Sequence, residues 1–277
     1  MRDISQTSLD RLIEAYDVFF VDQFGVLRDD EGAYPGAVEA LQRLKAADKT
    51  VVILSNSGRS GDYNASRFVS LGFRRDNFDH FVTSGDAAYA VLSRQGSPVS
   101  EGARCVTISS GGDRNLAERL GMRHVETFAE ADFLIISGSE AERISMDTYA
   151  DMLRPAAARN VPAICTNPDI HKLVQGTIAP GAGSIAQLYE RLGGMVRWFG
   201  KPHRDIYEEA LRLCGPPPLD QVICVGDSID HDILGAKKMG LHSVLVRTGI
   251  LADLPASQIE EMMIKDRQPT FLMEHFR

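Results

Sequence analysis

The chain has 277 residues, of which 44% are hydrophobic and 25% charged, so it can bury a full core and exceeds the usual size of one domain. Its net charge of −8 and its sequence pI near 5.4 argue against nonspecific binding to nucleic acid or to an anionic membrane, and favour a soluble protein. No run of about 18 apolar residues could span a bilayer and no signal-peptide pattern is visible, so we expect a cytoplasmic location.

The first third of the chain alternates strands and helices. A continuously apolar run at 18–21 predicts a strand that is covered on both faces, and Pro35-Gly36 opens an amphipathic helix. A second apolar run predicts a strand at 51–54, and the helix that follows it ends near Gly72. A third short strand is predicted at 81–82. This order is typical of a doubly wound, Rossmann-like parallel sheet.

The middle of the chain repeats this α/β pattern from about Asp86. It predicts strands at 105–108, 133–136 and 163–165, and one long helix at 146–158. An amphipathic helix through Ile185 is expected to return to the first layer, and the last strands are predicted at 222–225 and 244–246. We therefore expect a discontinuous core, formed by 1–84 and 181–277, that is split by an inserted α/β cap at 85–180.

Four short polar segments stand where strands of the core are expected to end. They contain Asp22, the pair Ser55-Asn56, Lys201, and the carboxylates Asp227 and Asp232. Ligands of open parallel sheets bind beyond the carboxyl ends of the strands, so these segments are expected to meet. Carboxylates that are brought together from distant parts of the chain predict one metal-assisted active site.

The order and spacing of these segments resemble the haloacid dehalogenase superfamily. They are most similar to its class IIA branch, the sugar-phosphatase and nitrophenyl-phosphatase-like proteins, in which a large α/β cap is inserted into the core. The segments 166–169 and 180–185 also resemble the cap loop and the return helix of that branch. The resemblance covers nearly the whole chain and implies an Mg²⁺-dependent hydrolase of phosphate esters.

The resemblance also implies roles for individual residues. Asp22 would attack phosphorus and form an aspartyl-phosphate, which water later hydrolyses. Ser55 would donate a hydrogen bond to a phosphoryl oxygen, aided by the backbone amide of Asn56, and Lys201 would neutralise charge on the phosphoryl group and the nucleophile.

The resemblance further implies the ligands of one Mg²⁺ ion. Asp22, Asp227 and the main-chain carbonyl of Phe24 would bind it together with water and a substrate oxygen, which are the hard ligands that Mg²⁺ prefers. Asp232 would bind metal-bound water or support Asp227.

Phe24 is a departure from the pattern of the family. Phosphatases of this superfamily usually carry a second aspartate at this position, which protonates the leaving alcohol and then activates water. Its loss predicts impaired turnover or a restriction to good leaving groups such as aryl or acyl phosphates, unless another group supplies the proton. Asp169 of the cap loop either replaces that acid or bonds within its own Asn-Pro turn.

The expected substrate is a small phosphorylated metabolite, because a cap of about a hundred residues would exclude a macromolecular phosphosite. Asn167 and Asp169 of the cap loop are the candidate substrate contacts. We expect no nucleic-acid partner and no membrane partner, and the resemblance permits a homodimer. Two alternatives stay open: a sensor or scaffold that binds phosphometabolites without turnover, and, as a minor one, a dehalogenase.

Overall fold

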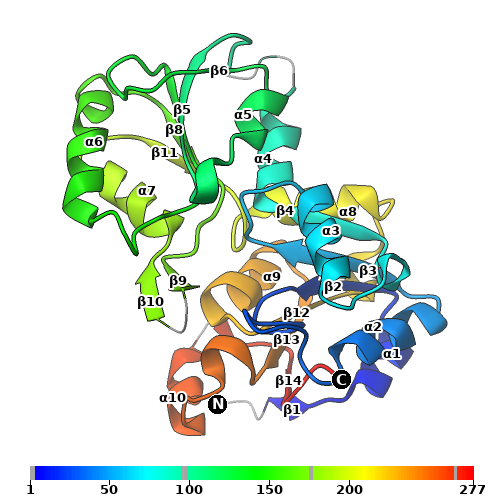
Figure 1. The fold of residues 1–277 in the computed structure, drawn as a ribbon. Coiled ribbons are helices and arrows are strands. Elements are labelled where there is room, and N and C mark those ends of the chain that lie inside the picture. Colours follow the sequence, from blue (N-terminus) through cyan, green and yellow to red (C-terminus); the bar gives the residue numbers. More distant parts are fainter. Residues whose placement is uncertain (1–3, 95, 97–98, 175–176, 265–266) are drawn as a thin grey trace. The chain divides into compact units, whose positions relative to one another are not determined.

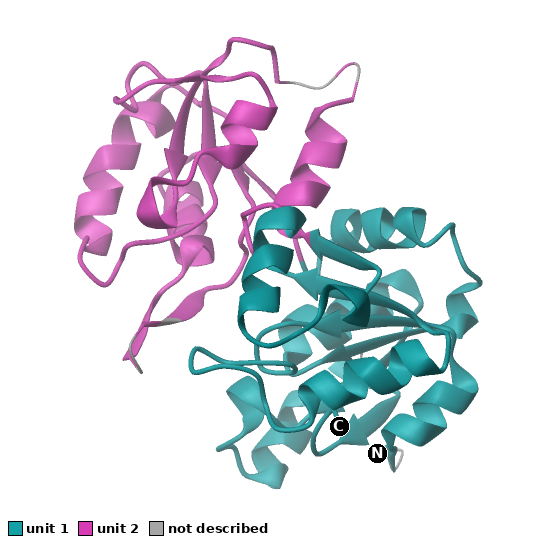
Figure 2. Cartoon of the chain, turned by 45° about the vertical axis from the view of Figure 1, so that its right-hand side comes forward, with its two compact units in different colours: residues 1–55, 61–82, 201–277 teal, residues 56–60, 83–200 magenta. Residues whose placement is uncertain are grey.

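The computed structural model describes residues 4–94, 96, 99–174, 177–264 and 267–277. The chain forms two compact units, which Figure 2 shows in different colours. Unit 1 consists of residues 1–55, 61–82 and 201–277, and unit 2 of residues 56–60 and 83–200.

Unit 1 is built on a seven-stranded sheet with the strand order β1-β14-β13-β12-β2-β3-β4. Neighbouring strands are parallel in each pair along this order from β1 to β3. The strands are β1 (Ser5–Gln6), β2 (Val18–Asp22), β3 (Thr50–Ser55), β4 (His80–Thr83), β12 (Val222–Gly226), β13 (His242–Val246) and β14 (Phe271–Met273). The chain passes from β2 to β3 on one side and later to β12 on the other, so the strand order reverses beside β2.

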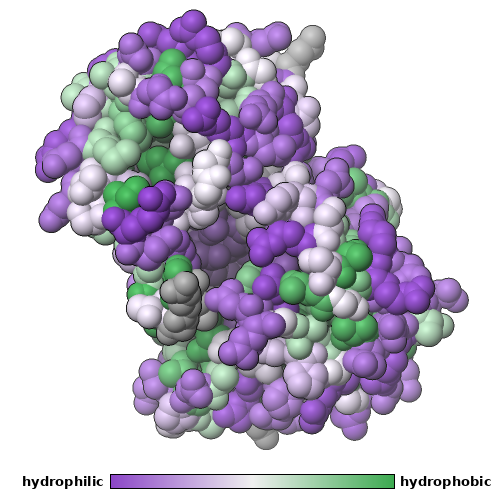
Figure 3. All heavy atoms as spheres, in the orientation of Figure 1, coloured by the Kyte–Doolittle hydropathy of each residue, from purple (hydrophilic) through white to green (hydrophobic). Residues whose placement is uncertain are grey.

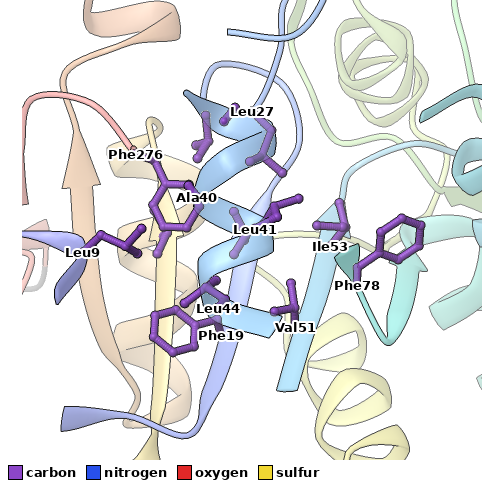
Figure 4. Packing of buried hydrophobic residues seen from close by; sticks show 14 of the residues in the cluster. Leu9, Phe19, Leu27, Ala40, Leu41, Leu44, Val51, Ile53, Phe78 and Phe276 are labelled. Carbon is purple, nitrogen blue, oxygen red and sulfur yellow. The ribbon is translucent and has the colours of Figure 1, made fainter. Parts of the chain in front are cut away.

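Helices cover both faces of this sheet because its central strands are apolar on both sides. In β13, Val244 and Val246 lie in one buried cluster and Leu245 in another. The first cluster contains apolar residues from the first three helices; Figure 4 shows Leu41 and Leu44 packed near Phe19 and Val51. The helices of unit 1 are α1 (Leu9–Ala15), α2 (Ala37–Ala46), α3 (Gly61–Ser70), α8 (Arg204–Leu213), α9 (Leu234–Met239) and α10 (Ala256–Met262).

Unit 2 has its own five-stranded sheet with the order β11-β8-β7-β5-β6, in which all four pairs are parallel. Its strands are β5 (Arg104–Ile108), β6 (Arg123–His124), β7 (Phe133–Ile136), β8 (Ala163–Cys165) and β11 (Val196–Trp198). An antiparallel hairpin is formed by β9 (His171–Val174) and β10 (Thr177–Pro180). The helices are α4 (Ser84–Leu92), α5 (Asn115–Arg119), α6 (Met146–Ala158) and α7 (Ala182–Arg191).

The boundary between the units differs from the expected one at residue 181. The helix α7, which was expected to return to the core, packs in unit 2, where Ile185, Ala186 and Tyr189 belong to the same buried cluster as Leu134 of β7. The following strand, β11, pairs with β8 of the same unit. The chain returns to unit 1 only at residue 201, because α7 and β11 complete the hydrophobic layer of the second sheet.

The predicted class, an α/β fold with a doubly wound parallel core and an inserted α/β cap, is confirmed. The apolar runs at 18–21 and 51–54 form the adjacent strands β2 and β3. The edge strand β1 and its neighbour β14 were not predicted, because runs of two or three residues carry too little pattern. Hydrophilic residues predominate on the face seen in Figure 3. Among the residues that the structure describes, no helix is both long and apolar enough to cross a membrane.

Candidate active site

Three neighbouring strands of unit 1 end in polar residues. Asp22 is the last residue of β2 and is in register with Leu54 of β3, whose last residue is Ser55. On the other side of β2, β12 ends at Gly226, directly before Asp227. Because these strands are parallel and adjacent, their polar residues emerge at one edge of the sheet, at the point where the strand order reverses. Open α/β sheets bind ligands at such a point.

Lys201 joins two of the carboxylates in a buried cluster. Its Nζ atom lies 2.6 Å from Asp22 Oδ1 and 2.7 Å from Asp232 Oδ1. The lysine side chain is only 3% exposed, and the side chains of Asp22 and Asp232 are 13% and 5% exposed. An ammonium group in this position compensates part of the negative charge that the fold collects at the strand ends.

Asp227 lies in a cradle of main-chain atoms. Its Oδ2 atom accepts a hydrogen bond from the backbone amide of Ile250 at 2.9 Å. Gly25 and Gly249 have φ angles of +83° and +57°, and a Cβ atom at either position would overlap Asp227 Oδ2. Thr248 closes this arrangement because its Oγ1 donates to the carbonyl oxygen of Gly25. The two glycines are therefore required both by conformation and by the close approach of the carboxylate.

Asp232 is held from two sides. Its Oδ1 atom accepts from Lys201, and its Oδ2 atom accepts from the backbone amide of Ser228 at 3.1 Å. Its side chain also lies against Gly226, where a Cβ atom would overlap it. The carboxylate is thus fixed toward the end of β12 instead of toward solvent.

Asp22, Asp227 and Asp232 together provide a donor set for a cation. One carboxylate oxygen from each residue can be chosen so that the three atoms lie within 4.8 Å of one another. Three carboxylates face a single ammonium group, so the cluster is short of positive charge. Buried oxygen ligands of this kind fit a hard divalent cation such as Mg²⁺.

Burial dominates the protonation of this cluster in the absence of a metal ion. It raises the pKa of Asp22 to about 7, although the positive charge of Lys201 acts in the opposite direction. Burial and the charges of Asp22 and Asp232 raise the pKa of Asp227 well above its usual range. For Lys201, burial lowers the pKa, but the charges of Asp22 and Asp232 outweigh it and hold the pKa above its ordinary value. The lysine is therefore charged, and Asp22 and Asp227 bind protons more readily than exposed carboxylates do.

Phe24 places no ionisable group beside this cluster. Its side chain is 47% exposed, and the guanidinium carbon of Arg28 lies 4.3 Å from the centre of its ring. The Phe24 and Arg28 backbones also form an isolated bridge. The predicted use of the Phe24 main-chain carbonyl as a metal ligand stays a prediction.

Ser55 is buried at the end of β3, where its hydroxyl group donates to Oε1 of Gln23 at 3.3 Å. Gln23 is itself buried and follows Asp22 directly. The sequence analysis did not single out Gln23, although its position next to a predicted nucleophile was a usable signal. In the structure the glutamine oxygen therefore accepts the single proton of the hydroxyl group that is predicted to bind a phosphoryl oxygen.

The remaining predicted residues belong to unit 2. Asn56 donates from Nδ2 to Asp169 Oδ1 at 2.8 Å. The side-chain oxygen of Asn167 accepts from the backbone amide of Asp169 at 3.2 Å, so the asparagine closes the Asn-Pro turn. The structure therefore brings Asp22, Lys201, Asp227 and Asp232 together in unit 1, and Asn56, Asn167 and Asp169 together in unit 2.

The loop after β13 contributes a part of the site that the sequence analysis missed. Gly249 and Ile250 line Asp227, yet the hydrophobic pattern identified only the strand that precedes them. A glycine soon after a predicted parallel strand was the signal available, since ligands of such sheets bind at strand ends.

The chain as a whole is similar to known families and proteins. The family model of the haloacid dehalogenase-like hydrolases matches residues 19–123, and a HAD-hydrolase-like model matches residues 198–277. D-glycerol 3-phosphate phosphatase from Mycobacterium tuberculosis is 27% identical over 270 residues, which are 96% of this chain and 71% of the relative.

Solved structures are also similar to this chain. A haloacid dehalogenase-like hydrolase from Brucella suis 1330 matches with a TM-score of 0.83 and 29% identity, covering 97% of this chain and 98% of the other. The magnesium complex of glycerol phosphate phosphatase from Mycobacterium tuberculosis matches with a TM-score of 0.76 and 25% identity, covering 96% of this chain and 77% of the other.

Proposed function

Because the chain belongs to the haloacid dehalogenase superfamily, as a phosphatase of the class IIA branch, we propose that it hydrolyses small phosphorylated metabolites with Mg²⁺ and an aspartyl-phosphate intermediate. The observation that carries this proposal is the buried cluster in which Lys201 bridges Asp22 and Asp232 beside Asp227. A purely structural ion pair would not need a third buried carboxylate cradled by two glycines.

In the first half of the reaction, a carboxylate oxygen of Asp22 attacks the phosphorus atom. A bond forms between this oxygen and phosphorus, and the bond between phosphorus and the leaving oxygen breaks. The ammonium group of Lys201 stabilises the negative charge on the carboxylate and the phosphoryl group, and the hydroxyl group of Ser55 donates to a phosphoryl oxygen. A hydroxyl group has one proton, so Ser55 would turn this proton from Gln23 Oε1, its acceptor in the structure, to the phosphoryl oxygen.

In the second half, water attacks the phosphorus atom of the aspartyl-phosphate, and the Asp22 carboxylate leaves. The bond between phosphorus and the Asp22 oxygen breaks, inorganic phosphate leaves with the protons of the attacking water, one of which it can lose to solvent, and the nucleophile is regenerated. In the structure Lys201 is also hydrogen-bonded to Asp232, so a second carboxylate would hold the ammonium group while Asp22 carries the phosphoryl group.

Asp22 and Asp227 would hold the Mg²⁺ ion, with Asp232 in support. When bound, the ion supplies positive charge that neutralises the phosphoryl oxygens. The close approach of Gly25 and Gly249 to Asp227 supports this assignment, because it fixes a carboxylate that has no cationic side chain of its own to pair with among the residues the structure describes.

Phe24 determines which esters can be hydrolysed efficiently. A positioned acid contributes about 10²–10⁴-fold to such a reaction, and phenylalanine provides none. The leaving oxygen must therefore depart with little proton assistance, as an aryl oxide or a carboxylate does. Aryl and acyl phosphates are the favoured substrates, and the activity toward alkyl phosphates is low.

The substrate class also follows the names of the relatives. D-glycerol 3-phosphate phosphatase and dihydroxyacetone phosphatase are both named for small phosphorylated compounds. The first is 27% identical to this chain and the second 28% identical. These names support a small phosphorylated compound as the substrate. Glycerol 3-phosphate has an alkyl leaving group, so Phe24 predicts that this chain hydrolyses such a compound more slowly than an aryl or acyl phosphate.

The proposal is tested by measuring phosphate release from sugar, aryl and acyl phosphates, with and without Mg²⁺. Asp22→Asn is the matched control because it keeps the size of the side chain and removes the nucleophile. We expect release that requires Mg²⁺ and is abolished in Asp22→Asn, and acid-quenched protein should carry phosphate on the peptide that contains Asp22. Absence of release from every ester, together with retained phosphometabolite binding, would instead favour a sensor or scaffold.

A further inference from the structure

The segment 56–60 follows a core strand but packs within unit 2. It continues directly from Ser55 at the end of β3, yet it belongs to the second compact unit. The carbonyl oxygen of Ser57 accepts from the backbone amide of Gly85 at 3.2 Å. A Cβ atom on Gly58 would overlap Ser137, and one on Gly85 would overlap the Gly58 carbonyl. This part of the chain therefore packs tightly against Ser137, the residue after β7, and against the first turn of α4.

Asp169 provides the acceptor that anchors the first residue of this segment. Its Oδ1 atom accepts from Asn56 Nδ2 at 2.8 Å. The Asp169 backbone is fixed on both sides: its amide donates to Asn167 Oδ1 at 3.2 Å, and its carbonyl accepts from the Gly183 amide at 3.0 Å at the start of α7. The acceptor is thus held in place before Asn56 binds to it, which reduces the entropy cost of the hydrogen bond.

Gly200 lies on another side of the Asn56 side chain. A Cβ atom on Gly200 would come 2.8 Å from Asn56 Oδ1 and would overlap Ser84 Oγ. Gly200 is the last residue of unit 2 before the chain re-enters unit 1 at Lys201. Asn56 and Gly200 therefore pack together, and each is covalently next to a residue of the proposed active site, Ser55 in one case and Lys201 in the other.

We propose that Asp169 is a positioning residue that acts through Asn56, and that it does not replace the missing general acid. By holding Asn56 against Gly200, it fixes the two chain segments that carry Ser55 and Lys201. This inference rests on the proposed phosphatase function. It assigns Asp169 a role other than the two that the sequence left open, because the carboxylate serves as a hydrogen-bond acceptor for the Asn56 side chain.

Comparing Asp169→Ala with Asp169→Asn distinguishes the positioning role of Asp169 from the role of a general acid. Asparagine keeps an oxygen that can accept from Asn56 but cannot act as an acid, whereas alanine removes both functions. We expect Asp169→Ala to lower kcat/KM for an aryl phosphate by about 10- to 100-fold, the range for losing a hydrogen bond to a charged group. Asp169→Asn should recover most of this loss and keep the wild-type pH profile. Asp151→Ala, an exposed aspartate of α6, is the matched control.

A double-mutant cycle with Asn56→Ala tests whether the effect of Asp169 on kcat/KM requires the Asn56 side chain. If Asp169 acts through Asn56, the double variant should be no slower than the slower single variant. Asp169→Asn as inactive as Asp169→Ala, or single effects that multiply in the double variant, would overturn the inference.

Hydrogen exchange of the backbone amides in 57–60 separates this inference from the proposed function. We expect faster exchange in Asp169→Ala than in the wild type and little change in Asp169→Asn, both without substrate. If no variant releases phosphate, the proposed function fails, and the exchange rates alone decide the positioning role. Equal exchange in all three proteins would then refute it.

Discussion

The ammonium nitrogen of Lys201 lies 2.6 Å from Oδ1 of Asp22, in an ion pair that is almost fully buried. The same nitrogen is 2.7 Å from Asp232, so one lysine side chain is the cation for a group of three buried carboxylates that includes Asp227. We therefore expect the stability of the metal-free site and the proposed phosphoryl transfer to depend on the same side chain.

Lys201→Met should leave the carboxylates without this cation. We expect a loss of about 3–5 kcal/mol in the free energy of unfolding in metal-free buffer, the usual cost of breaking a buried ion pair. Phosphate release should fall by at least about 10²-fold, because the charge that stabilises the phosphoryl group is lost. Chemical denaturation measures the first effect. Lys201→Arg is the control that keeps the charge, and a Met variant as stable as the wild type would contradict the assigned role.

Phe24→Asp should restore a proton donor beside Asp22. We expect the rate of alkyl phosphate hydrolysis to rise by about 10²–10⁴-fold, and the rate for aryl phosphates with good leaving groups to change much less. The measurement is the dependence of kcat/KM on the pKa of the leaving group, which should be steep in the wild type and shallow in the variant. Phe24→Asn is the matched control, since it has a similar shape but no acid. An equal gain in both variants would show that the phenyl ring only obstructs the site.

Gly249→Ala should weaken metal binding more than its backbone strain alone explains. Gly249 has φ +57° and its added Cβ atom would overlap Asp227 Oδ2, whereas Gly240 has φ +71° and open space around it. Gly240→Ala therefore reports the strain of a left-handed conformation alone, about 1–2 kcal/mol. For Gly249→Ala we expect a loss of Mg²⁺ affinity of about 10- to 100-fold as well, which isothermal titration would measure. Equal Mg²⁺ affinities of the two variants would argue against Asp227 as a ligand.

The effect of Mg²⁺ on thermal stability should depend on pH. The pKa of Asp22 is raised from 3.8 to about 7 in the metal-free protein, so the folded state binds this proton more tightly than the unfolded chain. The stabilising contribution of this proton is complete below about pH 4 and is lost as the pH rises toward 7. Mg²⁺ requires the deprotonated carboxylate, so its binding should strengthen over the same range.

We therefore expect the increase in Tm on adding Mg²⁺ to be larger at pH 8 than at pH 6. Differential scanning calorimetry at fixed Mg²⁺ concentration measures this difference. Asp22→Asn should show a smaller dependence on pH, because it removes one of the protons that compete with the metal. An increase in Tm that is the same at both pH values would mean that no group of the site titrates on binding.

The pattern of apolar and polar residues within short segments of the sequence was sufficient to predict the parallel sheet and much of the candidate site. Continuous apolar runs determined β2, β3 and β12, and the residues at their ends, Asp22, Ser55 and Asp227, were identified because parallel strands present their carboxyl ends at one edge. The order of the motifs along the chain then predicted the family, which the comparisons confirm.

Other features depended on contacts between residues that are distant in the sequence. The amphipathic pattern of α7 showed that one face would be buried, but not that the second sheet would cover it, so the boundary was expected at 181 instead of 201. The hydrogen bonds from Ile250 to Asp227 and from Asn56 to Asp169 follow from loops that meet only in the folded chain. Periodicity reports which side chains avoid water, whereas the partner that covers them or bonds to them is decided by packing in three dimensions.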